Sequence, residues 1–90
     1  MPEIFRDDEK GYLLWAARNP DGFIVNTDKA GTDPHYPMVH RATHRIMTSP
    51  KIQNYTTASY FKVCSNDMDE LERWSERERR KSLSRCGTCM

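Results

Sequence analysis

The chain has 90 residues, of which 37% are hydrophobic and 30% are charged, and its formal net charge at pH 7 is +1. This length fits one domain over residues 1–90 and leaves no room for a second core. No window approaches the roughly 18 apolar residues of a membrane span. The acidic first eight residues lack the basic-then-apolar order of a secretory signal. We therefore expect a cytoplasmic protein without a membrane segment.

The charges are distributed unevenly along the chain. Residues 1–39 carry four Lys or Arg against seven Asp or Glu, whereas residues 40–90 carry ten against six. The second half can therefore present a basic face. The near-neutral total nevertheless excludes a polycation that coats nucleic acid along its whole surface.

The first half of the chain predicts one helix and two strands. Asp8 caps a helix over residues 9–18, whose apolar residues recur at helical spacing. Four turn-forming residues, 19–22, lead to a short strand over 23–26 and then to an exposed loop over 27–34. A second strand over 36–42 contains Pro37, which favours a sheet edge or a late start of the strand. Residues 43–54 follow no clear pattern.

The second half predicts a strand, a helix and a tail. Residues 60–64 form the clearest strand, and Asp67 with Glu70 has the spacing of a capping box for a helix from Met68 to about Arg80. The tail covers residues 82–90. The order helix, strand, strand, strand, helix predicts an α+β fold with a small antiparallel sheet of about three strands between an N-terminal and a C-terminal helix.

The cysteines and histidines suggest a metal site. Three cysteines cannot all pair within one chain, and a cytoplasmic protein keeps its thiols reduced. Cys86 and Cys89 form a CxxC, in which a tight turn places both sulfurs on one zinc ion. Cys64, at the end of a strand, is the natural third ligand. Each histidine suits the fourth position chemically; we favour His44 because it lies beyond a strand end, whereas His40 lies within the strand.

The predicted ligand set has no open position, which is typical of a structural Zn²⁺ that closes the fold as a zinc knuckle. It consists of His44, Cys64, Cys86 and Cys89. Two alternatives stay open. Cys64 could be a small buried apolar residue, with the terminal pair as reactive thiols in a flexible tail. A redox pair is the weaker alternative, because only Met90 follows the motif and no helix N-terminus can stabilise a thiolate there.

Four short segments of the chain resemble the pattern GFxxN, LHRAxC, KVC and CGxC of a family of small, mostly uncharacterised bacterial proteins. They are residues 22–27, 40–44, 62–64 and 86–89. The resemblance spans nearly the whole length and implies no activity. The chain departs from the pattern at Val39, where Leu is common, and at His44, where the pattern has Cys. An exchange of Cys for His keeps a zinc ligand but not a disulfide partner, so the departure agrees with a metal site.

The sequence has no GxSxG, no Gly-rich phosphate loop and no HExxH, so we expect a non-enzymatic zinc-binding module. Nucleic acid is the favoured ligand, because tyrosines can stack on the bases of a single-stranded nucleic acid while neighbouring cations bind its phosphates. The candidate contacts are Arg41, Arg45, Lys62, Arg77, Arg80 and Arg85. A protein-interaction or regulatory adaptor is the first alternative, since it suits a near-neutral charge. A small nuclease or hydrolase with His40 as general base is the least favoured.

Overall fold

The computed structural model describes residues 2–44, 47 and 55–87, and in them it confirms the α+β class and both predicted helices. Among these residues, neither helix is long and apolar enough to cross a bilayer. The elements in chain order are β1 (Glu3–Phe5), α1 (Glu9–Arg18), β2 (Phe23–Asp28), β3 (Met38–Arg41), β4 (Tyr60–Ser65), α2 (Met68–Arg79) and β5 (Ser84–Arg85).

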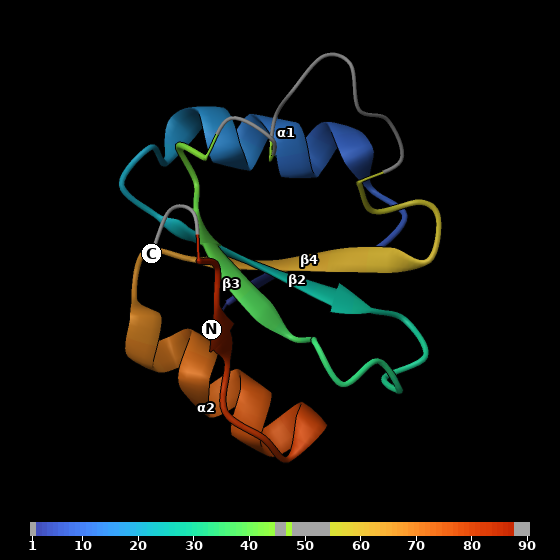
Figure 1. Cartoon of the computed structure of the whole chain (residues 1–90). Coiled ribbons are helices and arrows are strands. Elements are labelled where there is room, and N and C mark those ends of the chain that lie inside the picture. The colour runs from blue at the N-terminus through green and yellow to red at the C-terminus, as the bar shows by residue number, and fades with distance from the viewer. Residues whose placement is uncertain (1, 45–46, 48–54, 88–90) are drawn as a thin grey trace.

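The two helices cover opposite faces of one sheet (Figure 1). Because successive strand residues point to opposite faces, alternate residues of the central strands enter two separate cores. On the α1 side, Ile24 and Cys64 pack with Tyr12. On the α2 side, Val25 packs with Trp74 in a second cluster. Neither face of the central strands is therefore left to solvent.

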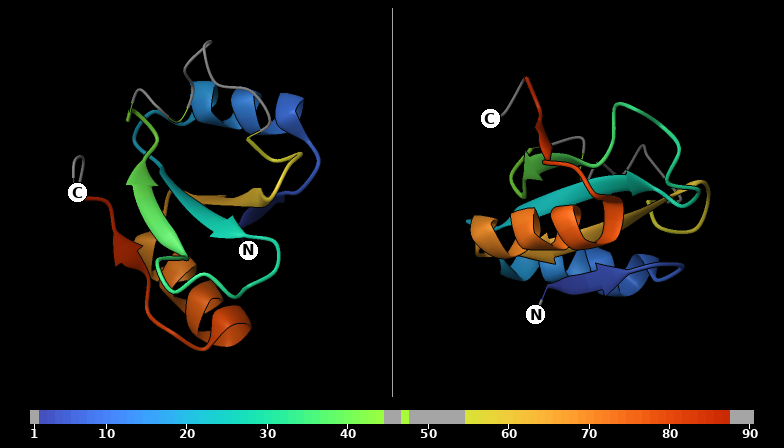
Figure 2. Two further views of the ribbon diagram at one scale, coloured as in Figure 1. Left: turned by 45° about the vertical axis from the view of Figure 1, so that its right-hand side comes forward. Right: turned by 90° about the horizontal axis from the view of Figure 1, so that it is seen from below.

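The sheet has five strands in the order β1-β4-β2-β3-β5. The first three pairings along this order are antiparallel, and only β3 with β5 is parallel. Strand β5 lies along the outer edge of β3 (Figure 2). The prediction of about three antiparallel strands was therefore too low, and the sheet is mixed. The two missed strands, β1 and β5, have three and two residues, which is too short for an alternating pattern to be recognised.

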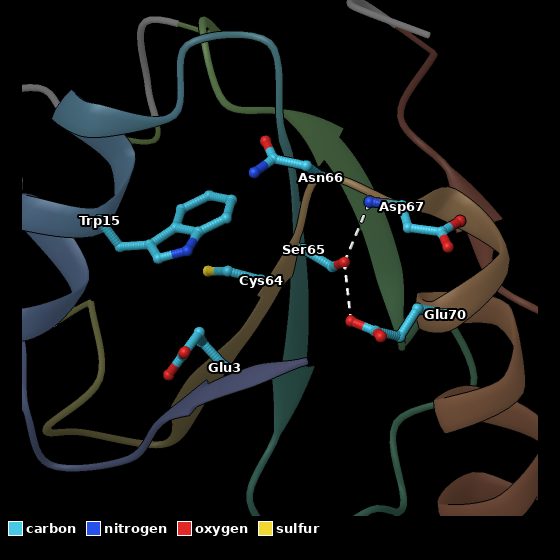
Figure 3. Close-up of a pocket in the computed structure, with 7 residues that line it drawn as sticks. All are labelled: Glu3, Trp15, Cys64, Ser65, Asn66, Asp67 and Glu70. Carbon is cyan, nitrogen blue, oxygen red and sulfur yellow. Dashed lines mark hydrogen bonds between the residues drawn. The ribbon is translucent and has the colours of Figure 1, made fainter. Parts of the chain in front are cut away.

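The start of α2 differs in detail from the predicted capping box. The Asp67 carboxylate accepts from the N–H of Asp69 at 2.9 Å, as an N-cap does. Glu70, however, does not reach back to the N–H of Asp67. Instead the Ser65 hydroxyl donates to Glu70 Oε1 at 2.9 Å and accepts from the Asp67 N–H at 3.0 Å (Figure 3). A serine from the preceding strand thus joins the two partners of the cap.

The chain turns back at the end of β3, and this turn shapes one end of the sheet. The strand begins after Pro37, as the sequence suggested, and is shorter than predicted. The Ala42 N–H donates to the Gly22 carbonyl at 2.9 Å, and the His44 N–H donates to the Arg41 carbonyl at 3.0 Å. The turn therefore carries His44 back toward the strand that precedes it.

We predict that two matched isoleucine truncations separate the core from the edge of the sheet. Ile24 is 0% exposed at the centre of the α1-side core, whereas Ile4 of β1 is 53% exposed. Ile24→Ala should lower the free energy of unfolding by about 2–5 kcal/mol, because it leaves a cavity. Ile4→Ala should lower it by less than about 1 kcal/mol. Urea denaturation measures both, and equal losses would contradict the described packing.

Candidate metal centre

Three side chains from separate segments converge beside strands β3 and β5, at one edge of the sheet. His40 comes from β3, His44 from the turn that follows β3, and Cys86 from the residue after β5. Each offers one ligand atom, and the three atoms lie within 4.8 Å of one another. We call these residues the His40–His44–Cys86 cluster.

The parallel pairing of β3 with β5 brings His40 and Cys86 together. The register pairs Val39 with Arg85, so the next residues along the two strands are His40 and Cys86. The Cys86 N–H continues this ladder by donating to the Val39 carbonyl at 3.0 Å. Residues at matching positions of neighbouring strands point to the same face, so the imidazole and the thiol lie side by side.

The turn after β3 supplies the second imidazole. The ring centroids of His40 and His44 are 5.6 Å apart, with 70° between the ring planes. His44 is half-buried, whereas His40 is only 7% exposed. His44 thus lies beyond the strand end, as the sequence indicated, while His40 within the strand reaches the same place through the pairing of β3 with β5.

The electrostatic setting of His40 keeps its ring neutral. Burial, followed by the nearby His44 and Lys62, lowers the pKa of His40 to about 4. A neutral imidazole has a lone pair available for a metal ion. The His40 Nδ1 atom is buried and has no hydrogen-bond partner among the described residues. Such a buried nitrogen costs about 1–3 kcal/mol when left unsatisfied.

The chemistry of these donors suits zinc better than the hard cations. Imidazole nitrogen and thiolate sulfur are zinc ligands, whereas Ca²⁺ and Mg²⁺ take oxygen ligands. Bond lengths of about 2.0–2.3 Å to zinc place ligand atoms roughly 3.5 Å apart in a tetrahedron. The three atoms, within 4.8 Å of one another, would come into range through small side-chain rotations.

The structure brings together two of the four predicted zinc ligands and separates a third from them. His44 and Cys86 belong to the cluster. Cys64 does not, because Cys64 and His40 both pair with Ile24 from its two sides. Two strand spacings, roughly 10 Å, therefore separate the backbones of Cys64 and His40. The structure therefore does not bring Cys64 to the cluster, and Cys89 lies outside the described residues.

The position of Cys64 agrees with the alternative interpretation, in which it is a small buried core residue. It is fully buried and belongs to the α1-side core, and burial raises the pKa of its thiol above the ordinary range. It borders a cavity of about 340 Å³ between Glu3, Trp15 and the start of α2. In Figure 3 its sulfur points to the Trp15 side of this cavity, away from Asp67 and Glu70.

Lys62, a predicted nucleic-acid contact, also lies in the interior. It is 4% exposed, and its ammonium group donates to Asn26 Oδ1 at 2.7 Å and to the Tyr55 carbonyl at 2.8 Å. Burial lowers the pKa of Lys62 to about 8. The structure therefore places this cation in the interior and not among the surface cations of the predicted contact set. Helix α1, through Tyr12, covers this face of β4 and keeps Lys62 from the surface.

The other described cations of the predicted contact set lie at the surface, and two of them lie close to carboxylates. Arg77 Nε donates to Glu78 at 3.2 Å, and Arg85 lies 3.8 Å from Glu72. Arg80 is exposed and ends α2 in the left-handed conformation, with φ 57°. Arg45 lies outside the described residues.

The arginines do not share one surface. Arg41 is exposed and pairs with Phe23 of β2, which on its other side pairs with Ser65 of β4. Helix α2 begins just after Ser65. Arg77 and Arg80 lie at the other end of this 12-residue helix. A helix of this length spans about 18 Å. Arg41 therefore lies apart from Arg77 and Arg80.

The fold and the cluster define a small α+β protein with a candidate His₂Cys metal centre. Comparisons of the chain with protein-family models, with curated proteins and with solved structures found no match. The functional inference therefore follows from the residues and geometry of this chain alone.

We predict that Cys64 is inert toward alkylating reagents in the native protein. The sulfur is buried and its thiol pKa is raised, so both access and thiolate formation are suppressed. After treatment with iodoacetamide at pH 8, peptide mass spectrometry should find Cys64 unmodified in native protein and modified in urea. Modification of the native protein at the rate of the unfolded chain would contradict this placement.

Proposed function

We propose that this protein is a zinc-binding module in which His40, His44 and Cys86 hold the ion and fasten the C-terminal segment to the sheet. One observation carries the proposal: ligand atoms from β3, from the following turn and from the segment after β5 approach within 4.8 Å of one another. Cys86 stands more than 40 positions after both histidines in the chain. Local sequence therefore does not force the cysteine to approach them.

The unpaired nitrogen of His40 is a second observation that supports a metal site. Buried polar atoms in folded proteins nearly always have a partner. A coordinated cation supplies the missing partner for a buried imidazole nitrogen, which supports zinc over a purely apolar role.

The fourth ligand follows from the sequence. Cys89 stands three residues after Cys86, and this CxxC spacing allows both sulfurs to bind one ion. The proposed set is then two cysteines and two histidines, with His40 in place of Cys64. Four protein ligands leave no open position, which gives the ion a structural role.

Nucleic-acid binding and an adaptor role stay predictions from the sequence. The buried Lys62 no longer contributes to the first. The exposed end of α2, with Arg77 and Arg80, is the part of the predicted contact surface most accessible to a test.

Cobalt titration of the metal-free chain tests the proposed ligands. Co²⁺ bound by thiolate in a tetrahedral site gives visible absorption, and zinc should displace it. We expect His40→Ala, His44→Ala and Cys86→Ser each to weaken binding more than the roughly 10–100-fold caused by losing an outer partner of a metal ligand. The reason is that each variant removes a direct bond to the ion.

Two variants serve as controls for the cobalt titration. His35 has a side chain 81% exposed beside Asp33, and Cys64 lies in the α1-side core. His35→Ala and Cys64→Ala should bind cobalt as the parent does. Loss of binding in Cys64→Ala with binding retained in His40→Ala would overturn the proposed set. Failure of the parent chain to bind cobalt would overturn the zinc proposal itself.

Charge reversal at the end of α2 tests the nucleic-acid prediction separately. Binding through these cations should weaken with salt, because phosphate contacts release counterions. The double variant Arg77→Glu, Arg80→Glu should lower affinity for a single-stranded oligonucleotide by about tenfold or more in low salt. Arg18→Glu, at the end of α1, is the matched control. Fluorescence anisotropy unchanged by the double reversal would remove this helix end from the contact surface.

A further inference from the structure

We infer that the metal controls the docking of residues 82–87, which include β5, against the edge of β3. In the metal-free protein this segment leaves the edge, while the rest of the sheet and both helices stay folded. The inference rests on the proposed zinc site and adds to it a regulated structural element.

Few backbone contacts hold the segment to the sheet. Strand β5 has two residues and pairs with β3 at two register positions. Around this pairing the Ser84 N–H donates to the Pro37 carbonyl and the Cys86 N–H donates to the Val39 carbonyl, both at 3.0 Å. By contrast, β2 pairs with β4 over six register positions. So short a strand gains little cooperativity from its own pairing.

The side chains of the segment add few buried contacts, and the Ser82 hydroxyl, which donates to Glu76 Oε1 at 3.0 Å, does so at an exposed position. Leu83 is buried in the α2-side core, and its N–H donates to Glu72 Oε1 at 3.0 Å. Ser84 and Arg85 are exposed, and the ion pair of Arg85 with Glu72 is long and half-exposed. Exposed ion pairs add little to stability. Leu83 and the adjacent end of the segment at Cys86, which are 8% and 7% exposed, therefore provide its apolar attachment.

The metal would join this weak segment to a strongly held strand. His40 belongs to β3, which pairs with β2 over four register positions. Cys86 is the last residue of the β5 ladder. A bond from one ion to both residues adds to the segment the attachment that its own contacts lack. The cores of the sheet consist mainly of residues outside 82–87, so they do not depend on the ion.

Release of the segment would expose the outer edge of β3. In the docked state the carbonyl groups of Pro37 and Val39 accept bonds from the segment. An uncovered strand edge presents such groups to any other strand. The metal state of the site would thus decide whether this edge of the sheet is covered.

Amide hydrogen exchange of the full chain with zinc and with EDTA tests the inference. On metal removal, the Ser84 and Cys86 amides should exchange faster by about tenfold or more, whereas those of Val25 and Val63 should change by less than about twofold. Unchanged exchange at Ser84 and Cys86 would overturn the inference. A common rise at all four positions would also overturn it, because the whole protein would then unfold.

A second measurement asks whether docking and metal binding are coupled. Leu83 is not a ligand, yet Leu83→Ala removes part of the apolar attachment of the segment and should weaken cobalt binding on the order of tenfold. Leu14→Ala, at a leucine 49% exposed on α1, is the matched control and should bind normally. Normal binding in Leu83→Ala overturns the coupling and leaves the zinc site standing. Absence of cobalt binding in the parent overturns both.

Discussion

The burial of the central strands between two helices is the constraint on which the rest of the structure depends. Strands β2 and β4 pair over six positions, and α1 and α2 cover the two faces that they present. A polar group buried on these strands gains stability when it finds a partner inside the protein. Lys62 does so through Asn26 and a backbone carbonyl. Groups that bind an external ligand are therefore displaced toward the ends and edges of the sheet.

The candidate metal centre lies at such a place. Strand β3 stands one position from the edge, and the two-residue strand β5 completes the sheet beside it. The turn after β3 and the end of β5 leave His40 with a buried nitrogen but without a partner in the described chain. A metal ion there would serve two purposes, because it would satisfy the nitrogen and attach the last strand. The proposed function of the site would therefore be a structural one.

Local signals in the sequence predicted the elements well where each signal is complete within a few residues. Asp8 and Asp67 mark the beginnings of the two helices, and the apolar run from Tyr60 onward marks β4. These local signals did not predict which side chains lie together across the sheet. Cys64 stands at a strand end and reads as a ligand, yet Ile24 lies between it and His40. The order of the strands decides this, and no local pattern encodes that order.

The sequence by itself determined the α+β class, both helices and the three longer strands, because capping and periodicity are local properties. Only the tertiary structure decided that the sheet has five strands, that His40 joins the cluster and that Cys64 and Lys62 are buried. Each of these facts depends on which strand lies beside which and on which helix covers it. Such contacts join residues far apart in the chain, and the free energy of packing, rather than local propensity, selects them.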